Sequence, residues 1–175
     1  MSDSSCLKPN ALAAYTVVVL SHEKRYLLLR RAETKRFAPG MWTGVGGLVE
    51  SSEFTDLQAA ALRELFEETG IVVNDISNLV LRRVLLHARP KSPLTLLLYF
   101  TGLLGSPSTL PECTEGTLAW ISRDQLAELK FIENAQLVIP LLISDLERDL
   151  TGEEQLQLGV AHYNPDNTME RIVWV

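Results

Sequence analysis

The chain has 175 residues, of which 46% are hydrophobic and 22% are charged, and its formal net charge is −6. This size and composition predict one soluble globular domain with a full core, and no apolar run is long enough to span a membrane. The acidic balance argues against a broad nucleic-acid-binding face, which needs a basic surface. It remains compatible with a small anionic substrate if metal ions or local arginines bridge the repulsion.

The N-terminal residues 1–13 are expected to form a disordered tail, since they are polar and lack the apolar core of a secretory signal. The rest of the chain, 14–175, is expected to form a single domain. Cys6 lies in the tail and Cys113 in a loop, and neither occurs in a spacing typical of a metal site. We therefore expect two reduced thiols in a cytoplasmic protein.

Hydrophobic patterning predicts strands at 15–20, 25–31, 75–88, 94–104 and 117–121, with a short strand that runs into a glycine-rich loop within 41–47. A short helix is expected after Ser122 as its N-cap. A longer amphipathic helix is expected over 134–150, where Pro140 indicates either a kink or a later start. Residues 159–175 predict a hairpin around the turn sequence NPDN. Since strands and helices interleave without strict βαβ order, the expected fold is a mixed sheet between helices, an α/β/α sandwich of the α+β type.

One further helix should follow the glycine-rich loop and end near Thr69. Thr55 and Gln58 have the form of an N-terminal capping box, and Gly70 suits the C-terminal cap. A buried stripe is predicted at the spacing i, i+3, i+4, i+7, formed by Leu62, Leu65, Phe66 and Thr69. Two small residues one turn upstream, Ala60 and Ala61, are expected to leave room for a ligand.

Three carboxylates, Glu64, Glu67 and Glu68, share another face of this helix at i, i+3, i+4. Like charges this close repel one another, which a solvated acidic face would tolerate. The preceding glycine-rich loop favours a different interpretation. Clustered carboxylates suit hard cations such as Mg²⁺, which in turn bind phosphates.

At this point the residues resemble a known family. The pattern that begins with Gly47, continues with Glu53 and runs from Arg63 through the three glutamates to Gly70 resembles the box motif of Nudix hydrolases. One departure is visible, since nine residues separate Glu53 from Arg63, two more than the family pattern has. A two-residue insertion near the helix start accounts for it, and leaves open whether Glu53 pairs with Arg63.

The resemblance implies a metal site and a set of catalytic residues. Glu64, Glu67 and Glu68 would hold Mg²⁺ or Mn²⁺ together with the backbone carbonyl of Gly46. Arg63 would orient a metal-binding glutamate, and a metal-bound carboxylate, with Glu64 and Glu67 as the catalytic candidates, would help to position or deprotonate the attacking water. Glu115 lies where the family often supplies a further metal-binding or basic glutamate. Glu112 is a nearby competitor, and Glu115 as an ordinary loop acid is an equal alternative.

Substrate contacts are implied by similarity to MutT-like members. Arg31 would bind phosphate through its planar fork, with Arg30 beside it. Asn134 would read a purine edge and Phe131 would form a pocket wall, while Trp42 would lie near the site. The alternatives are a solvated strand end for Arg30, a core position for Trp42 and a helix cap for Asn134.

The resulting hypothesis is a Mg²⁺-dependent, MutT-like nucleoside triphosphate diphosphatase that releases a nucleoside monophosphate and pyrophosphate, with 8-oxo-dGTP as a candidate substrate. Hydrolysis of a nucleotide-sugar, a dinucleotide or a related metabolite is one alternative, and a non-catalytic nucleotide-binding module is another. No nucleic-acid polymer and no membrane is expected as a partner, and a homodimer stays open. The C-terminal hairpin could complete the sheet, cover the pocket or contact a second subunit. The histidines His22, His87 and His162 have no partner by spacing, and no role is assigned to them.

Overall fold

The centre of the molecule is one mixed sheet of eight strands in the order β3-β2-β1-β5-β4-β7-β8, with β6 paired to β2. The computed structural model describes residues 12–89, 94–106, 110 and 112–175. The strands are β1 (Leu12–His22), β2 (Arg25–Arg31), β3 (Trp42–Thr43), β4 (Ile76–His87), β5 (Leu94–Leu104), β6 (Gly116–Ser122), β7 (Gln157–Tyr163) and β8 (Met169–Trp174). The tail predicted for residues 1–13 differs at its end, because Leu12 already pairs with Leu94 in the parallel β1–β5 ladder. Cys6 lies outside the described residues.

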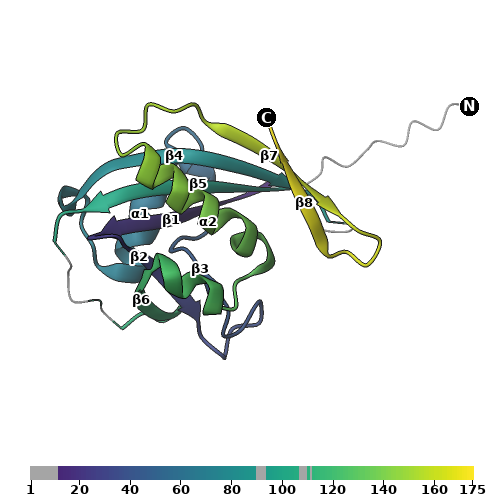
Figure 1. Ribbon diagram of the computed structural model, residues 1–175, viewed down its shortest axis with the longest axis horizontal. Helices are drawn as coiled ribbons and strands as arrows, with labels where there is room; N and C mark the ends of the chain where they lie inside the picture. The colour runs from purple at the N-terminus through teal and green to yellow at the C-terminus, as the bar shows by residue number, and fades with distance from the viewer. Residues whose placement is uncertain (1–11, 90–93, 107–109, 111) are drawn as a thin grey trace, which may run out of the picture.

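Two helices cover opposite faces of the sheet, α1 (Leu57–Thr69) and α2 (Glu133–Arg148), as Figure 1 shows. Short 3₁₀ turns occupy η1 (Ser51–Glu53), η2 (Val73–Asp75) and η3 (Arg123–Glu128). The alternation of β1 divides the core, since Val17 and Val19 pack in the α2 cluster and Val18 and Leu20 in the α1 cluster. The predicted sandwich of helices around a mixed sheet is therefore confirmed. None of the helices in the described ranges is long and apolar enough to cross a membrane.

The glycine-rich loop is built into the sheet beside β1. Strands β1 and β2 pair only next to their turn, at Ser21–Tyr26 and His22–Arg25. Along the rest of β1 the loop takes the place of a neighbouring strand, with isolated bridges between Val18 and Val45 and between Tyr15 and Leu48. This arrangement fixes the backbone of residues 45–48 against the middle of the sheet, directly before the turn that leads into α1.

The start and the buried face of α1 differ from the prediction. Asp56 is the N-cap, and its side chain accepts from the Ala59 amide at 3.0 Å, so the predicted capping box of Thr55 and Gln58 is wrong. The buried residues are Ala60, Ala61, Leu65 and Thr69, whereas Phe66 is 54% exposed. The alanines thus leave no room for a ligand, because they are where the helix packs on the sheet. The C-terminal cap is as predicted, with Gly70 in the left-handed region at φ 68°.

Two later elements also refine the prediction. Helix α2 begins at Glu133 and contains Pro140 in its interior, so a later start is wrong. Proline is tolerated there because it lies on the exposed face, where the carbonyl that would have accepted its missing N–H, that of Gln136, is exposed as well. The short helix after Ser122 is the 3₁₀ turn η3, capped by Ser122 and Gln125.

The C-terminal hairpin of β7 and β8 extends the sheet at the edge of β4. Strand β7 runs parallel to β4, with Arg83 opposite Gln157 and Leu86 opposite Val160, and β8 pairs with β7 in antiparallel orientation. In Figure 1 the yellow hairpin reaches beyond the end of the other strands. Its position at this edge matters for the site, because Tyr163 and Met169 of the hairpin line the main cavity together with His87 at the end of β4.

Candidate active site

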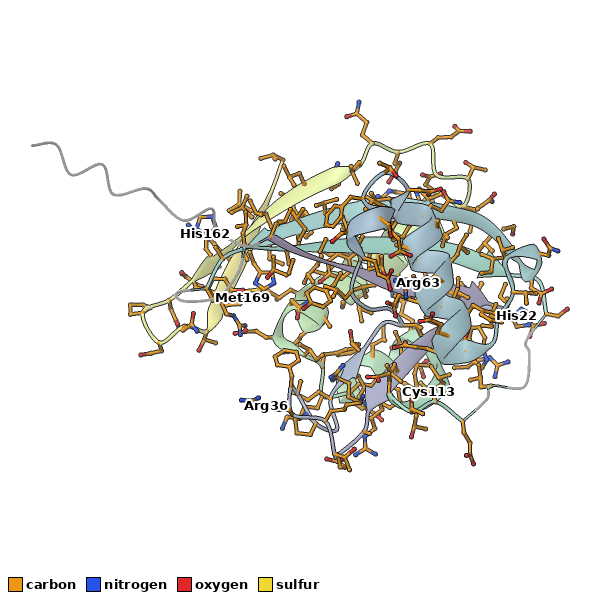
Figure 2. All side chains as sticks on the ribbon, turned by 180° about the vertical axis from the view of Figure 1, so that it is seen from behind. His22, Arg36, Arg63, Cys113, His162 and Met169 are labelled. Atoms are coloured by element: carbon orange, nitrogen blue, oxygen red, sulfur yellow. The ribbon has the colours of Figure 1, made fainter. Side chains whose placement is uncertain are left out.

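Arg63 on α1 is the centre of an acidic network at the surface seen in Figure 2. Its Nε and Nη2 donate to the two carboxylate oxygens of Glu53, at 2.7 and 2.9 Å. Its Nη1 donates to Glu64 at 2.8 Å and to Glu67 at 3.1 Å, and Nη2 also reaches the Leu48 carbonyl at 3.1 Å. One guanidinium therefore holds three carboxylates and the glycine-rich loop in a single arrangement.

The two glycines of the loop bring the backbone against this network. A side chain at Gly47 would overlap the carboxylate of Glu64, so that carboxylate lies directly over the loop. Gly46 has φ 146° and faces the Thr16 carbonyl where a Cβ would stand, which requires glycine. The Gly46 amide donates to the carboxylate of Glu68 at 3.2 Å, and no residue in the described ranges donates to the Gly46 carbonyl.

The environment of Glu68 is unfavourable for a bare negative charge. Burial is the main cause that raises the pKa of Glu68 to about 7, and the nearby charges of Glu115 and Glu64 add to it. The Gly46 amide and Arg31 act in the opposite direction. A cation at this place would relieve the repulsion, which is the electrostatic condition that a metal site meets.

Glu115 is placed near Glu68 by the loop before β6. Its backbone carbonyl accepts from the Ala32 amide at 2.9 Å, and its carboxylate accepts from Lys35 at 2.5 Å. Glu112, the competitor in the same loop, is exposed. Of these two glutamates, Glu115 is the one whose charge acts on Glu68 of the acidic helix.

The arrangement is not a preformed metal cage. Among the described residues no group of three or more histidine, cysteine, aspartate or glutamate side chains is arranged to hold an ion. The reason is visible in the contacts, since Arg63 engages Glu64 and Glu67 while Glu68 turns to the Gly46 amide. The donors themselves fit Mg²⁺ or Mn²⁺, because three carboxylates and an unpaired carbonyl are all hard oxygen ligands.

A cavity of about 500 Å³ lies on the α2 face of the sheet and reaches the acidic network at Gly46. Its floor comes from β1 and β5, through residues such as Val17 and Leu97. Strand order places Gly46 and Arg31 on one side of the floor and the β4–β7 edge on the other. Its volume is that of a small-molecule site.

The profile of the NUDIX domain matches residues 10–142. The chain belongs to the Nudix family. This match confirms the family membership that the box motif predicted.

Curated relatives match this Nudix chain over short segments. The m7GpppN-mRNA hydrolase NUDT17 of Xenopus laevis is 43% identical over 61 residues, which is 35% of this chain and 20% of that protein. The human protein of the same name is 44% identical over 55 residues, 31% of this chain and 16% of its own length. Nudix hydrolase 19, chloroplastic, of Arabidopsis thaliana is 36% identical over 78 residues, 43% of this chain and 17% of that protein. The chain thus spans a fifth or less of the length of these relatives.

Solved structures share the fold over most of the chain. The MutT protein from Bacillus halodurans has a TM-score of 0.64 at 21% identity and covers 93% of this chain and 97% of its own. A NUDIX hydrolase from Nitrosomonas europaea has a TM-score of 0.66 at 16% identity, covering 87% of this chain and 80% of its own. The NUDIX domain of Shewanella oneidensis NrtR, solved in complex with ADP ribose, has a TM-score of 0.56 at 19% identity and covers 86% and 94%. At these identities the likeness establishes the Nudix fold.

The candidate substrate residues fall into two groups in this Nudix domain. Arg31 and Asn134 line the cavity. Arg30 alternates to the outside of β2, where it bonds the Gly40 carbonyl and Glu33. Trp42 is partly buried and packs against the α2 core cluster, and Phe131 is buried within that cluster. Neither is among the residues that line the cavity.

Asn134 is held by the core rather than by the helix end. Its Nδ2 donates to the Tyr99 hydroxyl at 2.8 Å, and its Oδ1 has no partner among the described residues. It makes no capping bond for α2, whose N-cap, Ile132, makes no side-chain cap either. Burial raises the pKa of Tyr99 well above its ordinary value, so its hydroxyl stays protonated.

Four cavity residues could not be found from the sequence, namely His87, Arg89, Tyr163 and Met169. His87 lies at the end of β4, and its Nδ1 is 3.0 Å from the hydroxyl of Tyr163 in β7. Met169 is the first residue of β8, and Figure 2 labels it on the hairpin. Spacing gives no signal for this cluster, since its members come together only through the parallel pairing of β7 with β4.

Proposed function

We propose that the chain is a divalent-metal-dependent Nudix hydrolase that cleaves a phosphoanhydride bond of a nucleotide. The observation that carries the proposal is the set of oxygen donors gathered around Gly46, which lines the cavity and whose amide bonds Glu68 of α1. The carboxylates of Glu64, Glu67 and Glu68 would hold Mg²⁺ or Mn²⁺ with the Gly46 carbonyl. A bound ion would supply an acidified water and neutralise charge on the phosphate oxygens.

The chain's own residues position the reacting groups. Arg31 lines the cavity beside Gly46, where its guanidinium can donate two hydrogen bonds to a phosphate. Arg63 bonds one carboxylate oxygen of Glu64 and one of Glu67, so that the second oxygen of each has no donor among the described residues. Glu67 is the more open of these two, with 56% of its side chain exposed against 14% for Glu64. It is therefore the better placed to accept a proton from the attacking water.

A nucleoside triphosphate of the kind that MutT-like enzymes hydrolyse is the substrate class that the cavity favours. The phosphates would lie at Gly46 and Arg31, and the base would reach Asn134, whose free Oδ1 can accept from a purine edge. The products would be a nucleoside monophosphate and pyrophosphate, and 8-oxo-dGTP is the first candidate. A capped dinucleotide is the second, favoured by the local similarity to NUDT17 proteins of two vertebrates.

The deciding experiment measures phosphate and pyrophosphate release with Mg²⁺ from a panel of nucleotides. The panel contains 8-oxo-dGTP, the four normal dNTPs, ADP-ribose, a UDP-sugar and a capped dinucleotide. Glu67→Gln should reduce turnover by at least about 100-fold, whereas the exposed Glu128→Gln should retain it. Pyrophosphate release from a triphosphate supports the MutT-like class, and cleavage of the capped dinucleotide alone supports the second. Tight binding without turnover would instead indicate a binding module.

A further inference from the structure

We propose that the C-terminal hairpin is the specificity element of the cavity, with Tyr163 and Met169 forming the wall against which a planar, uncharged heteroaromatic base binds. This inference rests on the proposed function, because it describes the far end of the same cavity. The hairpin lies outside residues 10–142, which the family profile matches. The family match by itself therefore assigns the hairpin no role.

The wall is held in place by contacts to two other elements. The Tyr163 hydroxyl bonds His87 Nδ1 at 3.0 Å, and the Arg89 guanidinium lies 5.1 Å from the centre of the Tyr163 ring. The carboxylate of Glu133, at the start of α2, accepts from Arg89 at 2.5 Å and also from the Met169 backbone amide. The same glutamate thus joins both strands of the hairpin to α2, one directly and one through Arg89.

The charges in the cavity give a bound nucleotide one orientation. Arg31 lies on the side of Gly46 and has no carboxylate partner within the described residues. With the metal ion of the proposed function to offset the neighbouring carboxylates, that side would attract phosphate. On the hairpin side Arg89 is paired with Glu133, which leaves that side without net charge. His87 is neutral there as well, since burial and the neighbouring Arg89 lower its pKa. A second charged group on the ligand would find no compensation at the hairpin.

The surface of the far side suits a flat ring with polar edges. Met169 is buried, and together with Val17, Leu97 and Ile132 it provides apolar contacts. Three polar atoms remain without partners among the described residues: the Oδ1 of Asn134, the Nε2 of His87 and the buried Nε of Arg89. An apolar slot with a few polar atoms at its border is the environment in which a nucleobase stacks and is read at its edge.

The test compares ligands that share a phosphate end and differ in the base. Binding of GMP, AMP, UMP and ribose 5-phosphate to the native chain is measured by calorimetry with Mg²⁺. The native chain should bind at least one base-bearing monophosphate about tenfold more tightly than ribose 5-phosphate. Tyr163→Ala and Met169→Ala should remove most of that difference and leave the affinity for ribose 5-phosphate within twofold. His162→Ala, an exposed neighbour on β7 that Figure 2 labels, should behave as the native chain.

The outcomes separate the wall from the catalytic proposal. Tyr163→Phe keeps the ring and loses only the bond to His87, so it should lose part of the base preference and not all of it. If Tyr163→Ala does not fold, Tyr163→Phe provides the test. Its affinity should fall by about threefold for the base-bearing ligands only. Equal binding of ribose 5-phosphate by the native chain, no binding of any monophosphate, or an unchanged preference in the variants would overturn the inference. Failure of turnover with the base preference intact would remove only the proposed hydrolase activity.

Discussion

Arg63 and Glu53 form a two-pronged ion pair, with Nε–Oε1 and Nη2–Oε2 distances of 2.7 and 2.9 Å, across the turn that precedes α1. The nine residues between the two partners therefore do not prevent the pairing that the sequence left open. The same pair lowers the pKa of Glu53 to about 2, with the Arg63 hydrogen bonds as the largest cause.

Arg63→Lys should weaken metal binding by about 10–100-fold, because an ammonium cannot hold Glu53 in a two-pronged pair and also restrain Glu64 and Glu67. Titration of the chain with Mn²⁺, followed by calorimetry, measures the change. Arg148→Lys replaces an exposed arginine of a network away from the site and serves as the control. An Arg63→Lys chain with native metal affinity would show that the guanidinium does not organise the ligands.

Substitution of the two neighbouring glycines by alanine should have different effects on stability and on metal binding. Gly46→Ala places a Cβ on the Thr16 carbonyl at a φ of 146°, and the backbone cannot yield, so the free energy of unfolding should fall by about 1–3 kcal/mol or more. Gly47→Ala overlaps only the carboxylate of Glu64, which can rotate away. It should cost less than about 1 kcal/mol in stability while it weakens metal binding. Urea unfolding and Mn²⁺ titration of both variants test this, and equal stability losses would contradict it.

Local patterns predicted much of the fold. Strand β5 has the predicted bounds 94–104, and Gly70 ends α1, because alternation and a left-handed cap are properties of a few adjacent residues. The prediction of the buried face of α1 was wrong because that face is set by contacts with distant segments. Phe66 is the larger apolar residue, yet the sheet packs on Ala60 and Ala61, because small side chains let the helix approach closely. Which side faces the sheet depends on tertiary contacts that periodicity alone does not contain.

The candidate site also has one part that was predictable from the sequence and one that was not. The acidic network was predictable because Glu64, Glu67 and Glu68 lie within five residues of one helix, which follows the glycine-rich loop closely in the sequence. The far wall of the cavity was not, since His87 and Tyr163 are 76 positions apart and meet only when β7 pairs with β4. The placement of Arg30 follows from a simple rule about strands. Adjacent residues of a strand point to opposite sides, so Arg30 and Arg31 could not both reach the cavity.

Glu133→Gln should loosen the hairpin. The substitution removes the charge that Arg89 pairs with and weakens the acceptor for the Met169 amide. The loss should be about 1–2 kcal/mol in local stability. Hydrogen exchange should therefore become faster at Met169 and along β8, with little change in β5. Glu170→Gln, an exposed substitution on the same strand, is the matched control. Uniform protection in the Glu133→Gln chain would show that this carboxylate does not anchor the hairpin.

Asp145→Ala should be among the most destabilising substitutions. Asp145 is buried in α2 and binds both Nε and Nη2 of the buried Arg83, at 2.6 and 2.9 Å. Removal of one partner of a buried pair leaves the other charge uncompensated, which costs about 3–5 kcal/mol. Urea unfolding measures the loss. The double variant Asp145→Ala with Arg83→Met should recover a large part of it, whereas additive losses would mean that the pair is not the cause.

The ionisation of His87 should make the stability of the protein depend on pH near neutrality. Its pKa in the folded chain is lowered mainly by burial and secondly by Arg89, while Glu133 acts in the opposite direction. Below the ordinary value of about 6.5 the unfolded chain therefore binds more protons at this position than the folded chain does. The contribution of His87 to the free energy of unfolding should fall as the pH decreases through 6.5 towards the lower folded pKa, with a slope of at most about 1.4 kcal/mol per pH unit. Glu68, whose pKa is raised to about 7, contributes with the opposite sign in the same range, so the His87 contribution is read from the difference between the native and variant slopes. Urea unfolding between pH 7.5 and 5.5 should show a smaller slope for His87→Gln, whereas the exposed His162→Gln should keep the native slope. Equal slopes in the native and His87→Gln chains would mean that the imidazole is as free to take a proton in the cavity as in the unfolded chain, and that the far side of the cavity can carry positive charge.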